Sequence, residues 1–156
     1  LGDVYKRQNQ DNTIIKDFVL NDPTYNGKIL VAGKNFGSGS SREHAAWSIY
    51  DYGFRCVISS FFADIFKNNC LNIGVLPVKV EPAFLKDLYE IIYANPTTKI
   101  MVDLPSQMVS VEENNLVSSF EISSYKKNNL INGFDDIDYL LSIKNEIKDF
   151  AKKTLF

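Results

Sequence analysis

The chain has 156 residues, 45% of them hydrophobic and 23% charged, and its net charge of −2 leaves no basic surplus to neutralise the phosphates of a nucleic acid. No apolar run is long enough to cross a bilayer, and the polar N-terminus lacks the apolar stretch of a signal peptide. We therefore expect one cytoplasmic domain with its two cysteines, Cys56 and Cys70, reduced.

Hydrophobic periodicity divides the first half of the chain into alternating strands and helices. Residues 1–16 show no period, so we expect an unstructured or non-native leader before a domain that covers residues 17–156. Gly53 and Gly74 stand just beyond two of the helices, and Pro82 lies in the first turn of the third. The predicted strands are 28–32, 55–59 and 75–80, and the predicted helices are 41–52, 62–71 and 82–94. This alternation is typical of a parallel βαβαβ core.

The second half of the chain has a different pattern. Residues 100–104, 107–111 and 117–122 predict strands, and Asn114-Asn115 can turn the chain between the last two, which indicates an antiparallel extension. A last helix is predicted over Asp135–Lys153, with its acids early and its lysines late, as the helix dipole favours. Its apolar face carries Ile137, Leu140, Leu141, Ile147 and Phe150.

The stretch GKNFGSGSSREH, residues 33–44, joins the first strand to the first helix. It is no phosphate loop of the GxxxxGK[ST] kind, because no lysine stands between the last glycine and Ser40. It is no dinucleotide fingerprint either, because Arg42 occupies the position of the third glycine. A general anion site remains, made of free N–H groups at a helix N-terminus and of Arg42, whose fork fits a carboxylate.

These residues allow two interpretations of Ser40, one as a helix cap and one as a reactive serine. Ser40 and Glu43 match the capping box S-x-x-E, with Ser40 as N-cap and Glu43 as the third helical residue. The same N–H groups and Arg42 would also stabilise a serine alkoxide. His44, the only histidine, is either a packed residue or a base, and its spacing from Ser40 only loosely permits the contact that a Ser-His-Asp set needs.

The segments NFGSGSSREHA and DYGFRCVISSFFADIFKNNCLNIGVLPVKV closely resemble the small-subunit family of bacterial 3-isopropylmalate dehydratases, the swivel domain of the aconitase superfamily. The resemblance runs from DFVLN, which begins at Asp17, through SSYKKNNLINGFDDIDYLL, and DFVLN and ADIFKNN point to the leucine-biosynthesis branch. It implies an α/β swivel-type domain with a parallel βαβαβ core, an antiparallel extension and a C-terminal helix. Family members carry further residues before DFVLN, including a segment that selects the substrate side chain, so we expect an N-terminally truncated domain.

The resemblance also implies a reaction and its residues. Such enzymes interconvert 2-isopropylmalate and 3-isopropylmalate by removing and re-adding water, with a [4Fe–4S] cluster as Lewis acid. Carried over, Ser40 is the base, and Ser41 and Arg42 hold the substrate carboxylates. Gly37 and Gly39 would let the small dianion approach bare backbone. Two cysteines are too few for the cluster, so a large subunit is expected to supply it in a heterodimer, and this chain is expected to hold no metal.

Other functions remain open. Ser38 stands where bacterial relatives usually carry cysteine. The small subunits of homoaconitase and of methylmalate or citraconate hydratase share the glycine-serine-arginine motif and differ mainly in their choice of substrate side chain. A different class is a non-catalytic anion-binding or regulatory domain, in which Ser40 would matter only for stability.

Overall fold

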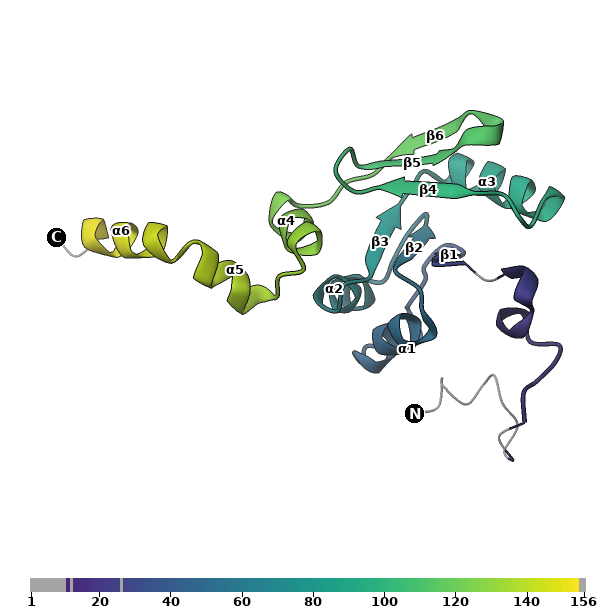
Figure 1. Cartoon of the computed structure of the whole chain (residues 1–156), viewed down its shortest axis with the longest axis horizontal. Coiled ribbons are helices and arrows are strands. Elements are labelled where there is room, and N and C mark those ends of the chain that lie inside the picture. Colours follow the sequence, from purple (N-terminus) through teal and green to yellow (C-terminus); the bar gives the residue numbers. More distant parts are fainter. Residues whose placement is uncertain (1–10, 12, 26, 155–156) are drawn as a thin grey trace. The chain divides into compact units, whose positions relative to one another are not determined.

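The computed structural model describes residues 11, 13–25 and 27–154 (Figure 1). The chain divides into two compact units, the first ending at Glu121 and the second beginning at Ile122. Most of the leader expected at residues 1–16 therefore lies outside the described residues. Two short 3₁₀ helices, η2 (Val19–Asn21) and η3 (Pro23–Tyr25), precede the first strand. Within the described part of the chain, no helix combines the length and the apolar character that a membrane span requires.

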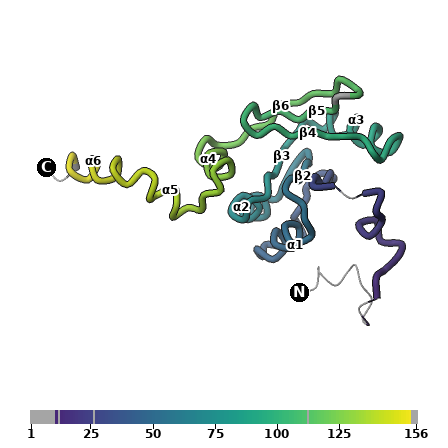
Figure 2. Tube along the Cα trace, in the orientation of Figure 1, coloured from purple at the N-terminus to yellow at the C-terminus, as the bar shows by residue number. Residues whose placement is uncertain are grey.

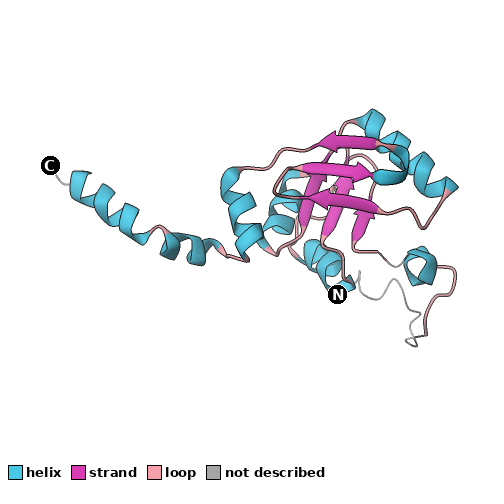
Figure 3. Ribbon diagram, turned by 45° about the horizontal axis from the view of Figure 1, so that its top comes forward, coloured by secondary structure: helices cyan, strands magenta, loops and turns pink. Residues whose placement is uncertain are grey.

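A parallel three-stranded sheet forms the centre of the first unit, as the alternating pattern predicted (Figure 3). Its strands are β1 (Ile29–Val31), β2 (Cys56–Ser59) and β3 (Leu76–Lys79), in the order β1-β2-β3. Leu30 of β1 pairs with Val57 of β2, and on its other side Val57 pairs with Pro77 of β3. All four residues of β2 are buried, which is what a central parallel strand covered on both faces requires.

Three helices alternate with these strands: α1 (His44–Tyr52), α2 (Asp64–Asn72) and α3 (Pro82–Ala94). Gly53 ends α1 in the left-handed region, at φ 115°, and its N–H bonds the carbonyls of Ile49 and Tyr50. One hydrophobic core contains Ala46 of α1, Phe66 and Cys70 of α2, Val57 of β2, and Val75, which directly precedes β3. Ala32, which follows β1, and Phe62, which follows β2, belong to the same core, so the core supports both loops.

The expected antiparallel extension is also present. Its strands are β4 (Ile100–Asp103), β5 (Met108–Val111) and β6 (Leu116–Ser119), in that order. The predicted turn at Asn114-Asn115 consists of a short 3₁₀ helix, η4 (Glu112–Asn114), followed by Asn115 at φ 51°. Val109 and Val111 of β5 are completely buried, and α3 contacts β6. The fold class predicted from the sequence is therefore confirmed for this unit.

The second unit contains α4 (Ser124–Asn132), α5 (Asp136–Ser142) and α6 (Lys144–Thr154), and α5 and α6 follow one another end to end (Figure 2). The prediction of one continuous helix over residues 135–153 is wrong, because the helix breaks at Ile143. The Ser142 hydroxyl donates to the Tyr139 carbonyl at 2.7 Å, a local bond of the kind that bends helices. The five apolar residues expected on one face are all exposed in this unit.

Candidate functional site

The glycine-rich loop lies at the edge of the sheet where parallel strands end. Residues 32–43 follow β1, and residues 60–63 follow β2. Because the three strands are parallel, their carboxyl ends meet at one edge, which is where open α/β sheets bind ligands. The sequence-predicted residues Ser40, Ser41 and Arg42 are therefore placed together at the usual ligand-binding edge of the fold.

The first half of this loop is anchored to the segment after β2 through Phe36. The Phe36 N–H donates to the Phe61 carbonyl at 3.1 Å, and the Ala63 N–H donates to the Phe36 carbonyl at 3.0 Å. These bonds form an isolated parallel bridge between Phe36 and Phe62. The Phe36 ring also meets the Phe66 ring edge-on, with centroids 5.3 Å apart. Residue 36 is thus held by its backbone and by its side chain.

The two glycines assigned to ligand approach have different surroundings. Gly37 has φ 83°, and a Cβ on it would lie 2.2 Å from Cγ of Phe66. Packing of this chain therefore already requires glycine at position 37, without any ligand. Gly39 has no neighbouring atom within 4 Å of an added Cβ, so nothing in this chain requires glycine there. Between the two, Gly39 is the one whose bare backbone faces open space.

The predicted capping box of Ser40 and Glu43 does not form. Helix α1 begins at His44, and its N-cap is Glu43, which has helical angles and makes no side-chain cap bond. The reason is a tight first turn, in which the Ala45 N–H bonds the Arg42 carbonyl at 3.2 Å and the Ala46 N–H bonds the Glu43 carbonyl at 2.9 Å. The helix therefore starts three residues later than predicted, and Ser40 lies outside it.

Ser40 instead closes a local turn in front of the helix. Its Oγ accepts a hydrogen bond from the Arg42 N–H at 3.2 Å, and its side chain is half-buried. Ser41 and Arg42 are exposed. Among the described residues, no acceptor meets the backbone N–H groups of Glu43 and His44. The start of α1 thus offers free donors, a positive helix end and an exposed guanidinium, a combination that suits a carboxylate.

His44 is not paired with Ser40. Its ring lies 4.8 Å from the ring of Trp47, centroid to centroid, at an angle of 54°, and its side chain is exposed. Within the described residues, neither a serine nor a carboxylate hydrogen-bonds the imidazole. The arrangement that a Ser-His-Asp set needs is therefore not assembled here.

One buried polar residue at this edge was assigned no role from the sequence. Ser59, the last residue of β2, is completely buried, and its hydroxyl lies 2.8 Å from the Gly33 carbonyl. The sequence signal was a serine directly after the apolar residues CVI, on a strand predicted to lie beside the glycine loop in a parallel sheet. That signal marks a position, but it does not reveal the partner.

The side chains do not fit an iron–sulfur cluster. Cys56 and Cys70 are free and buried in the core, and burial raises the pKa of each thiol to about 12, so both stay protonated at neutral pH. Cluster ligands are thiolates, usually three or four of them. In the described ranges, no group of three or more histidine, cysteine or acidic side chains could hold a metal ion.

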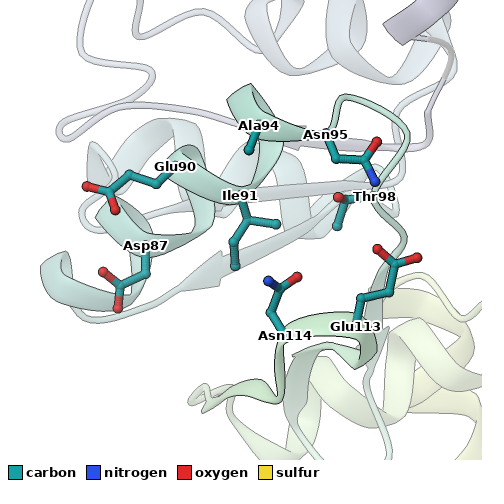
Figure 4. Close-up of a pocket in the computed structure, with 8 residues that line it drawn as sticks. All are labelled: Asp87, Glu90, Ile91, Ala94, Asn95, Thr98, Glu113 and Asn114. Carbon is teal, nitrogen blue, oxygen red and sulfur yellow. The ribbon is translucent and has the colours of Figure 1, made fainter.

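A hollow of about 550 Å³ lies between α3 and η4, and none of its lining residues belongs to the glycine loop (Figure 4). It is lined by Asp87, Glu90, Ile91, Ala94, Asn95, Thr98, Glu113 and Asn114. Figure 4 shows the Glu113 carboxylate across the hollow from those of Asp87 and Glu90, so the acids do not converge on one point. The glycine loop remains the better candidate site.

Comparison with known proteins supports this choice. The Aconitase C-terminal domain family matches residues 2–83, which include the whole parallel sheet and the glycine loop. A 3-isopropylmalate dehydratase small subunit from Cytophaga hutchinsonii is 57% identical over 150 residues, which cover 96% of this chain and 75% of that protein. The corresponding protein from Azobacteroides pseudotrichonymphae is 52% identical over 147 residues, or 94% of this chain and 75% of that one.

A solved structure is similar as well. The crystal structure of 3-isopropylmalate dehydratase from Methanocaldococcus jannaschii has a TM-score of 0.58 and 29% sequence identity, and the match covers 78% of this chain and 67% of that one. Sequence and fold therefore agree on the same relatives.

Proposed function

This chain belongs to the family of 3-isopropylmalate dehydratase small subunits, within the aconitase superfamily, and we propose that it is the subunit of a hydro-lyase that serves leucine biosynthesis. The reaction is the interconversion of 2-isopropylmalate and 3-isopropylmalate by dehydration and rehydration. One observation carries the proposal: the exposed Ser41 and Arg42 and the half-buried Ser40 lie beside free N–H groups at the carboxyl edge of the parallel sheet.

Substrate binding follows from the charges at the start of α1. Isopropylmalate is a dianion, and the Arg42 guanidinium can hold one carboxylate through two parallel hydrogen bonds. The Ser41 hydroxyl and the free N–H groups of Glu43 and His44 supply further donors beside the positive end of the helix. Gly39 leaves the approach to these donors open.

Ser40 is proposed as the base. In its deprotonated form, its Oγ takes the proton from the substrate carbon, and the C–H electron pair forms the double bond. The hydroxyl on the neighbouring carbon departs with its bonding electron pair and takes a proton from solvent to become water. The N–H of Arg42, 3.2 Å from this oxygen, favours its deprotonated form, as does the nearby positive helix end. Rehydration runs through the same atoms in reverse, and addition of water to the other carbon gives the isomer.

A large-subunit partner completes the site in this proposal. The departing hydroxyl needs a Lewis acid, and the described side chains do not fit one. We therefore propose that a large subunit brings the [4Fe–4S] cluster to the carboxyl edge of the sheet. The cluster is then a property of the complex, and this chain contributes the base and the carboxylate donors.

Reconstitution with a large subunit tests the function. We expect turnover of both isopropylmalate isomers by the purified complex and none by either polypeptide alone. After anaerobic reconstitution, the isolated chain should show no cluster absorbance and no stoichiometric iron. Turnover by the isolated chain would refute the need for a partner. A complex that prefers homoaconitate, or methylmalate and citraconate, would be a sister hydro-lyase, and a complex without any turnover would favour a non-catalytic domain.

Replacing Arg42 tests the carboxylate contact. Arg42→Lys keeps the charge and loses the forked geometry, so we expect substrate binding to weaken by about 1–3 kcal/mol, or roughly 5- to 150-fold. Steady-state kinetics of the assembled enzyme measure this as a higher KM. Lys34→Arg, in the exposed first half of the same loop, is the matched control and should leave KM unchanged. Unaltered kinetics in Arg42→Lys would make Arg42 an ordinary surface residue.

A further inference from the structure

We propose that Ser59 is a positioning residue, which holds the glycine loop in the conformation that presents Ser40 and Arg42 to the substrate. This inference rests on the proposed function for its activity readout. Ser59 ends β2 and is completely buried, so its side chain cannot touch a substrate that approaches from solvent. Any effect on the reaction must therefore pass through the residues that Ser59 contacts.

The contacts of Ser59 join the loops that follow two neighbouring strands. Its hydroxyl lies 2.8 Å from the Gly33 carbonyl and 2.9 Å from the Phe61 carbonyl, and its Oγ accepts from the Phe61 N–H at 3.3 Å. A serine hydroxyl has one proton to donate, so the two carbonyls share it. Through these bonds, one side chain links the root of the glycine loop to the segment after β2.

These bonds continue where the regular sheet ends. The last ladder bond between β1 and β2 runs from the Ala32 N–H to the Ile58 carbonyl at 2.8 Å. One residue further along, the Ser59 hydroxyl bonds the Gly33 carbonyl. The Phe61 carbonyl, which Ser59 also contacts, accepts a hydrogen bond from the Phe36 N–H at 3.1 Å. Gly33 and Phe36 are thus fixed by one connected network, and Phe36 lies four residues before Ser40.

Loss of the hydroxyl should change loop geometry more than stability. Gly33 is exposed, so water can satisfy its carbonyl once the serine bond is gone. The backbone between Gly33 and Phe36 would then lose its side-chain restraint, while the Phe36 bonds to Phe61 and Ala63 remain. A small displacement is sufficient, because misplacement of a catalytic group by about 1 Å can cost roughly a hundredfold in rate.

Ser59→Ala in the complex with the large subunit tests the proposal. We expect kcat/KM to fall by roughly ten- to a hundredfold. In the full chain, amide hydrogen exchange over residues 33–43 should become faster while the exchange of β2 and β3 stays the same. Ser59→Cys, similar in size and a weak donor, should lie between Ser59→Ala and the wild type. Ser60→Ala is the matched control, because Ser60 is a buried neighbour without a hydrogen-bonded hydroxyl among the described residues.

The outcomes separate this inference from the function on which it rests. Normal kcat/KM and normal loop exchange in Ser59→Ala would overturn the positioning role, and so would a lower melting temperature with unchanged kcat/KM in the folded complex. Faster loop exchange in Ser59→Ala, together with a wild-type complex that does not turn over isopropylmalate, would support the positioning role and refute the proposed function.

Discussion

Ser40→Gly is expected to lower the turnover of the assembled enzyme by roughly 10²–10⁴, the usual contribution of a general base. This corresponds to about 3–5 kcal/mol of activation free energy. Stability should hardly change, because Ser40 precedes the N-cap of α1 and its side chain makes one local bond, to the Arg42 N–H. Steady-state kinetics, thermal unfolding and a binding assay with the large subunit measure the three quantities separately.

Two further serine variants sharpen this result. Ser40→Ala should lose as much turnover as Ser40→Gly, because both remove the oxygen. Ser38→Ala should keep wild-type turnover, since Ser38 is exposed in the same loop and its backbone N–H, which bonds the Asn35 carbonyl, is retained. If Ser40→Gly keeps more than about a tenth of wild-type turnover, the base lies elsewhere. His44 would then have to leave its contact with Trp47 to take that role.

Alanine at the two loop glycines should give opposite results. Gly37→Ala puts a Cβ 2.2 Å from Cγ of Phe66 at a left-handed φ of 83°, so we expect the free energy of unfolding to fall by about 2–5 kcal/mol. Gly39→Ala meets open space, so its stability should stay within about 0.5 kcal/mol of the wild type. Its methyl group would nevertheless occupy the approach to Arg42, and kcat/KM should fall by about tenfold or more.

Chemical unfolding of the isolated chain measures the stability of both variants, and steady-state kinetics of the complex measure their kcat/KM. Each glycine variant serves as the control for the other. A stable Gly37→Ala variant would mean that Phe66 can move aside at little cost. Full activity in Gly39→Ala would show that neither substrate nor partner comes close to position 39, and the carboxylate would then have to reach Arg42 by another route.

The parallel core could be predicted because its signals are local. Strands β2 and β3 are short apolar runs, and Gly53 stands directly after the helix that it ends. The starts of α1 and α2 were less accurate, whereas α3 spans Pro82–Ala94 as predicted. Phe62 was predicted to be helical, but its backbone is held in a bridge to Phe36, so α2 begins at Asp64.

The second unit shows the limits of periodicity. Helix α4 was not predicted, because the polar segment SYKKNNLIN has a weak apolar period. Its signals were the caps: the Ser123 side chain accepts from the Lys126 N–H, and Gly133 follows the last turn. The break at Ile143 had no such signal, since the apolar spacing continues across it.

Within the candidate site, Ser40, Ser41 and Arg42 could be proposed from the motif alone, because their types and order resemble those of a known family. The reason for Gly37 could not, since it depends on Phe66 in another helix. Nor could the contacts of Ser59, whose hydroxyl meets a carbonyl 26 residues away in the chain. Residues that bind or react with a ligand can be identified from a sequence motif. The contacts of the residues that hold them in place can be identified only once the fold is known.

The buried cysteines have a practical consequence for labelling. Both thiols of this sequence are buried in the core and protonated at neutral pH, so they should not react with alkylating reagents while the fold is intact. A thiol introduced by Ser38→Cys, at an exposed position beside the site, would then be the one accessible thiol of the variant. A fluorophore attached there would report the arrival of a large subunit or a substrate at the glycine loop, without removal of any native cysteine.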